Sequence, residues 1–228
     1  ILKPAFDWIL YSAQPARFDA ELSYVSGGMS WSSDYNIVAP ETGDTLELMG
    51  WVTLDNQSGK QFDHARIKLM AGGGCMSPTD ELEHTQFTIE EMAAACYEAT
   101  SVGRITLAHV YTPQGILNAL RAGVRSIEHG NFLDEESAAA MRHAGAFFVP
   151  TLTTYTLISA HGAAQGIPRK MIDKIDKAKA GGLESLKLAQ AAGLEICSGS
   201  DVLGAMQPFK AMELGLKAQV LGAHGAIL

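Results

Sequence analysis

The sequence has few cysteines, and their spacing does not suit a disulfide framework or a zinc knuckle. Only Cys75, Cys96 and Cys197 occur among 228 residues, and no two of them form a C-x-x-C pair. An odd number of widely spaced cysteines is typical of a chain from a reducing compartment. We therefore expect a cytoplasmic location by default.

Positive charge is also scarce. The chain has 17 Lys and Arg against 25 Asp and Glu, a formal net charge of −8, and no run of basic residues. A surface of this kind does not favour phosphate backbones or anionic lipid, so we expect neither a nucleic-acid partner nor a membrane partner. The longest uncharged stretch, 144–168, contains Pro150 and several threonines and does not suit a membrane span.

The first part of the chain has the short apolar alternation of antiparallel strands. Strands are predicted at 20–25, 35–38 and 46–54, separated by turn residues such as Ser26-Gly27-Gly28, and no helix of any length fits there. We therefore expect residues 1–65 to form a small antiparallel β segment.

After Gly72-Gly73-Gly74, strands alternate with helices that have clear start and stop residues. Thr88 and Glu91 form a capping box, Pro113 follows the cap residue Thr112, and Asp134 opens a third helix. A longer helix is predicted over 169–192 with a break near Gly181-Gly182, and a last one over 208–218. Strands are predicted at 66–70, 105–108, 124–127, 147–149 and 194–197.

This alternation predicts an α/β fold in which residues 66–228 form about five parallel strands with helices, a partial (β/α)8-type barrel. A complete barrel needs eight such strands, so the barrel is expected to be truncated. An exposed parallel edge would favour pairing with another chain, and we expect a homo-oligomer.

Polar residues gather at the predicted strand ends, where catalytic groups lie in parallel α/β folds. Lys68 is near the end of the first strand, His109 ends the second, His129 ends the third, and Asp201 follows the fifth. Two imidazoles and a carboxylate suit Zn²⁺, which takes about three protein ligands in catalytic sites. A single histidine at a strand end is more often structural, but this set favours a metal site.

Other chemistries have weaker signals. The chain lacks G-x-S-x-G, S-x-x-K and H-E-x-x-H motifs, and its glycine run lacks dinucleotide or P-loop spacing. Cys197 is a possible nucleophile, although a small buried apolar role is the more common one. His84, on the loop after the first strand, is either a residue facing the same crevice or a solvated loop residue.

Several motifs resemble the metal-dependent amidohydrolase superfamily, in particular its imidazolonepropionase-like and Xaa-Pro dipeptidase-like members. The resemblance covers about 66–215, and its motifs occur in family order. They are Ile67 to Gly73, Glu83-His84-Thr85-Gln86-Phe87, Ala108-His109, Ala122 to Gly130, Val149-Pro150-Thr151-Leu152 and Gly199-Ser200-Asp201.

The resemblance implies a role for each site residue. Lys68 would be the carboxylated lysine that bridges two metals, His109 and His129 would hold the second metal, and Asp201 would be a ligand and proton shuttle. The family also has an H-x-H motif on its first strand, and this chain has none. Tyr111 stands where relatives often have a second histidine, and with His84 it is a candidate for substrate binding. We therefore expect an incomplete site that binds one divalent ion through His109, His129 and either Lys68 or Asp201.

The first part of the chain resembles a bacterial β-domain of unknown function from mucoidy-inhibitor-like proteins. The motifs are residues 28–35, which begin Gly28-Met29-Ser30-Trp31, and residues 50–59, which begin Gly50-Trp51-Val52. Because the two resemblances overlap only over 65–72, we expect a chimera in which two truncated genes are joined in frame.

These observations give three functional hypotheses. The first is metal-assisted hydrolysis of an amide, ester or lactone bond in a small substrate, with Asp201 passing a proton to the leaving group. The second is a non-catalytic, oligomerising remnant of the fold. The third is a serine or cysteine esterase site formed anew.

Overall fold

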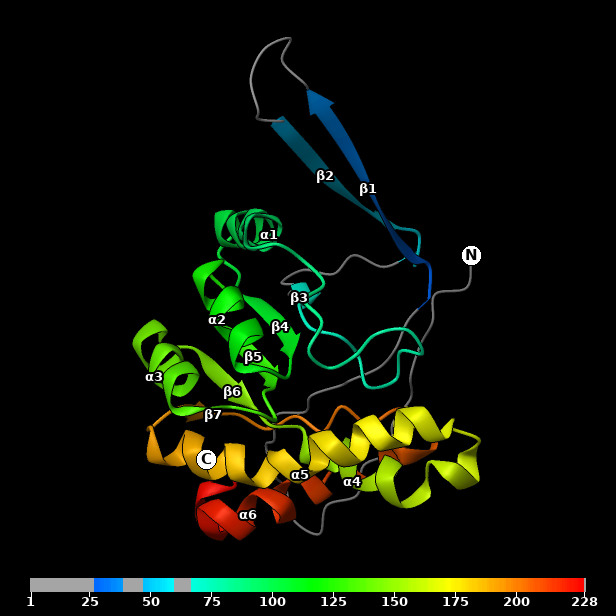
Figure 1. Ribbon diagram of the computed structural model, residues 1–228, viewed down its shortest axis with the longest axis vertical. Coiled ribbons are helices and arrows are strands. Elements are labelled where there is room, and N and C mark those ends of the chain that lie inside the picture. Colours follow the sequence, from blue (N-terminus) through cyan, green and yellow to red (C-terminus); the bar gives the residue numbers. More distant parts are fainter. Residues whose placement is uncertain (1–26, 39–46, 60–66, 228) are drawn as a thin grey trace, which may run out of the picture. The chain divides into compact units, whose positions relative to one another are not determined.

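The chain divides into two compact units, Ile1–Asp63 and His64–Leu228. The structure, a computed structural model shown in Figure 1, describes residues 27–38, 47–59 and 67–227. No helix among these residues is long and apolar enough to cross a membrane.

The first unit contains an antiparallel hairpin. Strand β1 (Met29–Val38) pairs with β2 (Glu47–Asn56), with Met29 opposite Asn56 and Val38 opposite Glu47. The antiparallel pairing confirms the pattern expected from the sequence, although β1 begins six residues earlier than the predicted start at residue 35. The predicted strand at 20–25 lies outside the described residues.

The second unit contains a five-stranded parallel sheet in the order β3-β4-β5-β6-β7 (Figure 1). The strands are β3 (Ile67–Met70), β4 (Thr106–Val110), β5 (Ser126–His129), β6 (Phe147–Val149) and β7 (Glu195–Ile196). All five predicted strands form, and strands that follow each other in the chain are neighbours in the sheet. This is the α/β, partial-barrel arrangement that the sequence predicts.

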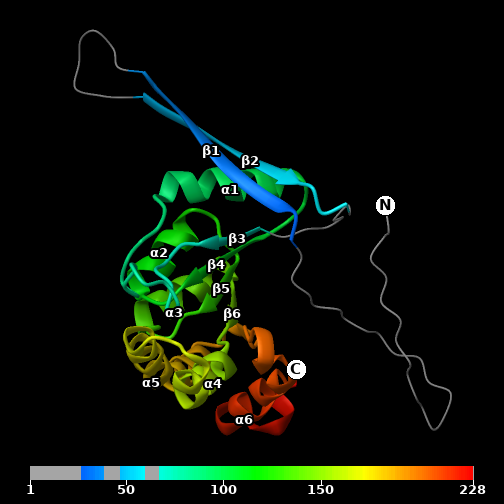
Figure 2. The ribbon, with the colours of Figure 1, turned by 90° about the vertical axis from the view of Figure 1, so that its right-hand side faces the viewer.

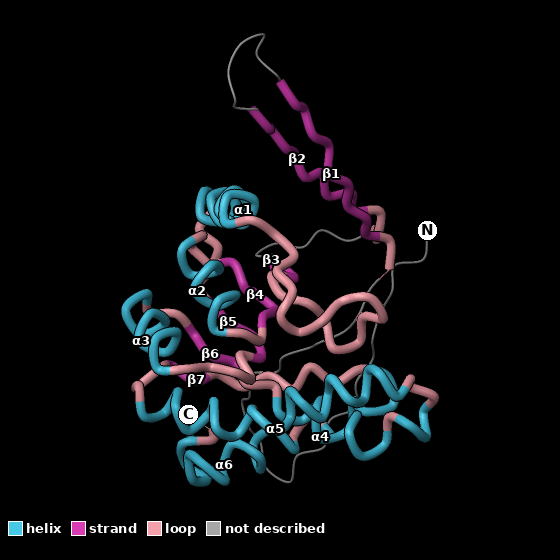
Figure 3. Tube along the Cα trace, in the orientation of Figure 1, coloured by secondary structure: helices cyan, strands magenta, loops and turns pink. Residues whose placement is uncertain are grey.

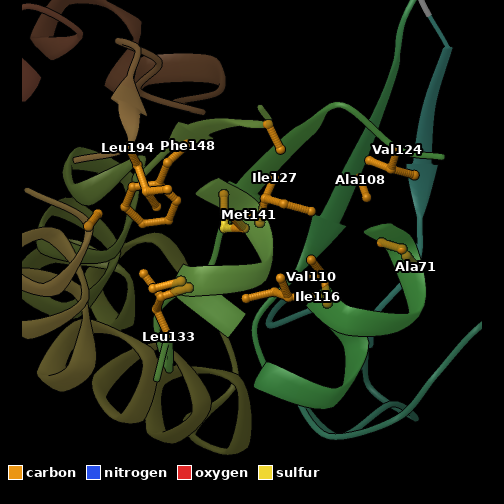
Figure 4. Close-up of a cluster of buried hydrophobic side chains, with 14 of the residues drawn as sticks. Ala71, Ala108, Val110, Ile116, Val124, Ile127, Leu133, Met141, Phe148 and Leu194 are labelled. Atoms are coloured by element: carbon orange, nitrogen blue, oxygen red, sulfur yellow. The ribbon is translucent and has the colours of Figure 1, made fainter. Parts of the chain in front are cut away.

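Three helices connect the first strands and lie on one side of the sheet (Figure 1), and Figure 2 views the same elements after a turn of 90°. They are α1 (Ile89–Ser101), α2 (Pro113–Arg121) and α3 (Glu135–Ala144). Each begins at a predicted cap: Thr88 and Asp134 complete capping boxes, and Thr112 accepts a bond from Gly115 N. Alternate strand residues, including Ala108, Ile127 and Phe148, pack under these helices against Ile116 and Met141 (Figure 4).

Three further helices gather near β6 and β7. They are α4 (Leu152–His161), α5 (Arg169–Ala191) and α6 (Met212–Gly225), with short 3-10 turns at Ala163–Gln165 and Gly204–Phe209. The sequence analysis predicts no element where α4 lies, and the predicted break near Gly181-Gly182 is wrong, because α5 continues through both glycines. The predicted last helix at 208–218 is split between a 3-10 turn and α6.

The two glycines in α5 are explained by the close packing of this helix against Asn131 and Leu152. A Cβ on Gly181 would lie 2.2 Å from the carbonyl oxygen of Asn131, and a Cβ on Gly182 would lie 2.8 Å from Leu152 Cδ2. The glycines therefore let the helix approach its neighbours and do not interrupt it.

The long loop after β3 is fastened to α5 (Figure 3). Lys174, which is 5% exposed, donates from Nζ to the carbonyl oxygens of Gly74, Ser77 and Asp80 at 3.0, 2.6 and 2.7 Å. Lys170 pairs with Glu81 at 3.0 Å. Loop residues that follow the first strand of the parallel sheet are thus held by the side chains of one helix.

A pair of glycine variants tests the packing account of α5. Replacing Gly181 by Ala forces a methyl group against backbone, so we expect a net loss of about 1 kcal/mol or more in the free energy of unfolding. Gly215→Ala, on the open side of α6 with nothing within 4 Å of the new Cβ, is the control and should gain up to about 1 kcal/mol from helix propensity. Urea denaturation measures both, and equal stabilisation by the two variants would contradict the account.

Candidate functional site

The parallel register brings two histidines together at the carboxyl ends of β4 and β5. Val110 pairs with His129, and His109 pairs with Glu128. The imidazole centroids of His109 and His129 lie 4.4 Å apart with the rings inclined at 74°. His109 is 6% exposed and His129 is 1% exposed, so the pair is almost removed from water.

The two nitrogens of His129 have different surroundings. Nδ1 lies 2.7 Å from Thr151 Oγ1 and 2.7 Å from Tyr155 Oη, so two hydroxyl groups face it. Nε2 is buried and has no hydrogen-bond partner among the described residues, and Oδ2 of Asp201 lies 3.9 Å from it. One side of the ring is therefore fixed by hydroxyls, and the other side faces a carboxylate.

Two tyrosines enclose the histidine pair. Tyr111 stacks on His129 with ring centroids 5.3 Å apart, and it meets His109 edge-on at 5.0 Å. Tyr155 contacts both His129 and Tyr111 edge-on. Burial raises the pKa of both tyrosine hydroxyls, and Cys75, whose thiol pKa burial raises to about 11, hydrogen-bonds Tyr111. Tyr111 is only 2% exposed, so in this structure it packs against the imidazoles and lies away from solvent.

Backbone strain is concentrated at this site. Within 27–38, 47–59 and 67–227, the non-glycine residues with positive φ are His129 (77°), Thr151 (49°) and Asp201 (48°). His129 is the last residue of β5, Thr151 lies two residues after β6, and Asp201 lies five residues after β7. Such conformations persist when the surrounding structure enforces them, and they cluster at functional sites.

Burial controls the charge of these groups. Desolvation lowers the pKa of His109 to about 4 and that of His129 well below its ordinary value, with the Lys68 charge acting in the same direction. Partial burial raises the pKa of Asp201, and Lys68 opposes that shift. Both imidazoles are therefore neutral near pH 7 and available as ligands or bases.

Lys68 and Glu128 lie on the face of the sheet that bears His109. Lys68 is exposed on β3, and its charge acts on His109, His129 and Asp201. Glu128 is 8% exposed, accepts a 2.8 Å hydrogen bond from Ser126 Oγ, and has a pKa raised mainly by burial. Lys68 was expected from the sequence, whereas Glu128 was not assigned a role.

His84 and the spacing of the predicted metal ligands do not complete a metal site. His84 is exposed, and its Nδ1 accepts a 3.1 Å hydrogen bond from Glu81 N within its own loop. No group of three or more His, Cys, Asp and Glu side chains in the described part of the chain lies close enough to hold a metal ion. The structure thus brings together His109, His129 and Asp201 only loosely, and His109 Nε2 lies 3.4 Å from Gly73 O.

Sequence reasoning did not assign Thr151 and Tyr155, the two hydroxyl partners of His129. The motif containing Thr151 was noted for its resemblance but without a role for the threonine. Tyr155 lies on α4, whose existence the sequence pattern did not predict.

Comparisons with known proteins identify the family. The model of the Amidohydrolase family matches residues 53–225. The chain belongs to this family. An ochratoxinase from Aspergillus niger is 33% identical to it over 135 residues, which are 59% of this chain and 28% of that protein.

Two crystal structures resemble this member of the Amidohydrolase family. A prolidase complexed with N-methylphosphonate-L-proline has 43% identity and a TM-score of 0.69, over 71% of this chain and 40% of that one. The A. niger ochratoxinase has 30% identity and a TM-score of 0.62, over 70% of this chain and 38% of that one. The chain thus spans about two fifths or less of the length of these relatives.

The buried histidines predict acid sensitivity in the metal-free protein. His109 has a pKa of about 4 when folded and an ordinary value of 6.5 when unfolded, so the unfolded chain binds more protons between these pH values. Stability should therefore fall as pH falls, by about 2 kcal/mol from this residue between pH 7 and pH 5. Urea titrations in chelator measure it. His109→Gln should reduce the dependence of the free energy of unfolding on pH, whereas the exposed control His143→Gln should not. The same pH dependence in the unmodified chain and in both variants would show that His109 is not the source of the acid sensitivity.

Proposed function

We propose that this chain is a hydrolase of an amide bond in a small substrate, assisted by one divalent metal ion. The observation that supports it most is the environment of His129. Its Nε2 is buried, lies 3.9 Å from Asp201 and has no hydrogen-bond partner in the part of the chain that the structure describes, while its Nδ1 faces two hydroxyls. Membership of the Amidohydrolase family supports the reaction class.

The hydroxyl groups of Thr151 and Tyr155, which face Nδ1, favour the tautomer of His129 that has its proton on Nδ1. A proton on Nδ1 can be donated to Thr151 or Tyr155, whereas a proton on Nε2 would be a buried donor with no acceptor within hydrogen-bond distance. The Nδ1–H form leaves a lone pair on Nε2. Metal-ligating histidines are oriented in this way by their second nitrogen.

The types of donor at this site suit a divalent cation, although in the described residues the side chains would have to move closer together to form a complete metal cluster. His129 Nε2 and a carboxylate oxygen of Asp201 would hold it, with His109 as a further imidazole and Lys68 as a candidate carboxylated ligand. When bound, such an ion polarises a carbonyl group and makes water more acidic. Zn²⁺ suits imidazole and carboxylate ligands, and it is the ion that we propose.

Asp201 has the properties of a proton carrier. Its pKa is raised by partial burial, and its side chain is 45% exposed, so it can reach a substrate. In the proposed reaction water attacks the carbonyl carbon, Asp201 accepts the water proton, and the same proton passes to the leaving nitrogen as the C–N bond breaks. His84, which is exposed on the loop after β3, remains a candidate for substrate binding, whereas Tyr111 is 2% exposed and packs against the two histidines instead.

Hydrolysis assays test the proposal. Dipeptides with a C-terminal proline are the first substrates to try, because one similar structure holds a proline phosphonate. With Zn²⁺ supplied, we expect turnover that His129→Gln and Asp201→Asn each reduce by about 10² to 10⁴-fold. His143→Gln is the control and should retain full activity. Turnover unaffected by both site variants would exclude this site, and the absence of turnover on any amide, ester or lactone would favour a non-catalytic remnant.

A second candidate function has one observation in its favour. Ser198 Oγ lies 2.7 Å from Nζ of the buried Lys217, and a serine beside a lysine is the nucleophile and base of some hydrolases. Burial lowers the pKa of this lysine. Covalent labelling of Ser198 by a serine-reactive phosphonate, lost in Ser198→Ala, would support an esterase of this kind.

Two further expectations also stay proposals. The first is that the N-terminal residues derive from the mucoidy-inhibitor-like β-domain by a gene fusion, for which the family match gives no support, because it begins at residue 53, before the predicted junction at 65–72. The second is homo-oligomerisation through the sheet edges β3 and β7, which sedimentation analysis would test.

A further inference from the structure

Helix α4 is capped from another helix. The carboxylate of Glu213, on α6, accepts bonds from Leu152 N at 2.9 Å, Thr153 N at 2.8 Å and Thr153 Oγ1 at 2.7 Å. Glu213 is 2% exposed. Thr151, the N-cap residue of α4, makes no side-chain cap bond, because its hydroxyl faces His129 instead. The first turn of α4 therefore depends on a carboxylate 60 residues away in sequence.

One helical turn after Glu213, a second buried side chain reaches the next loop. Lys217, 1% exposed, donates from Nζ to Ser198 Oγ at 2.7 Å and to Cys197 O at 3.4 Å. Positions four apart lie on the same side of a helix, and the opposite charges of Glu213 and Lys217 attract each other. One face of α6 thus holds the segment after β6 and the segment after β7.

These two segments contain the groups around His129. The first contains Thr151 and Tyr155, whose hydroxyls face Nδ1, and the second leads to Asp201, which faces Nε2. We propose that Glu213 and Lys217 are positioning residues: together they fix the hydroxyls and the carboxylate on opposite sides of the His129 ring. The inference deepens the proposed function and rests on it.

Glu213 can fix the first turn of α4 because the hydrogen bonds that it accepts are buried. In Glu213→Gln an NH2 group replaces one carboxylate oxygen, so either Leu152 N or the two donors of Thr153 would lose their acceptor away from water. The first turn of α4 would then have to shift to find another. Thr151 has a left-handed backbone at φ 49°, a conformation that persists only under such constraint. A shift there would move Thr151 and Tyr155 away from Nδ1.

Nitrogen NMR of the metal-free chain tests the positioning directly. The seven histidines would be labelled with ¹⁵N and the His129 signals assigned with His129→Gln, because the nitrogen shifts distinguish the Nδ1–H and Nε2–H tautomers. At a fixed pH of 7 we expect the Nδ1–H form in the unmodified chain, and a shift towards a mixture of tautomers in Glu213→Gln. Glu184→Gln, an exposed change on α5, is the matched control and should leave the signals unchanged.

A second variant keeps the test decisive if Glu213→Gln does not fold. Thr153→Val removes one of the three donors to Glu213 and retains the carboxylate, so it should shift the His129 signals in the same direction by a smaller amount. Unchanged His129 signals in folded Glu213→Gln, or in Thr153→Val when the former does not fold, would overturn the proposal.

Zinc affinity gives the second readout. Changes that disturb the outer partners of a ligating histidine weaken metal binding about 10- to 100-fold, so calorimetry should show a loss of at least about tenfold in Glu213→Gln and none in Glu184→Gln. If the unmodified chain binds no zinc, the proposed metal-assisted function fails while the NMR comparison still decides the positioning role. If zinc binds equally to all three proteins, the positioning role fails and the proposed function does not.

Discussion

The parallel register of β4 and β5 is the constraint on which the candidate site depends. Pairing Val110 with His129 sets the two strand ends level, so the imidazoles of His109 and His129 meet with ring centroids 4.4 Å apart. Apolar residues of the same strands maintain that register, because they pack between the sheet and helices α1, α2 and α3. A slip in the register would separate the histidines as well as disturb the core.

Burial and hydroxyl contacts then determine what these histidines can do. The pair is almost fully removed from water, which keeps both rings neutral, and the tyrosines complete the enclosure. Thr151 and Tyr155 define one side of His129, and Asp201 defines the other. The bonds from Glu213 and Lys217 connect that arrangement to α6, so a helix late in the chain contributes to the geometry at the sheet.

Much of the second unit could be predicted from the sequence because its signals are local. The caps Thr88, Thr112 and Asp134 and the apolar strands define elements through residues close together in the chain, and His109, His129 and Asp201 follow from the rule that strand ends meet. Helix α4 could not be predicted in this way. It is buried on most of its surface, so it lacks an amphipathic period, and its cap is Glu213 from α6. Gly181 and Gly182 predicted a break because glycine disfavours a helix interior. The contacts that require glycine there come from Asn131 and Leu152, which are distant in sequence.

Metal content per chain, measured by mass spectrometry on protein purified without chelator and without a histidine tag, tests the central claim most directly. The comparison is a His109→Ala/His129→Ala double variant prepared in the same way. The account predicts about one divalent ion per chain and its loss in the double variant. No bound metal in the unmodified chain, or equal metal in both proteins, would contradict it.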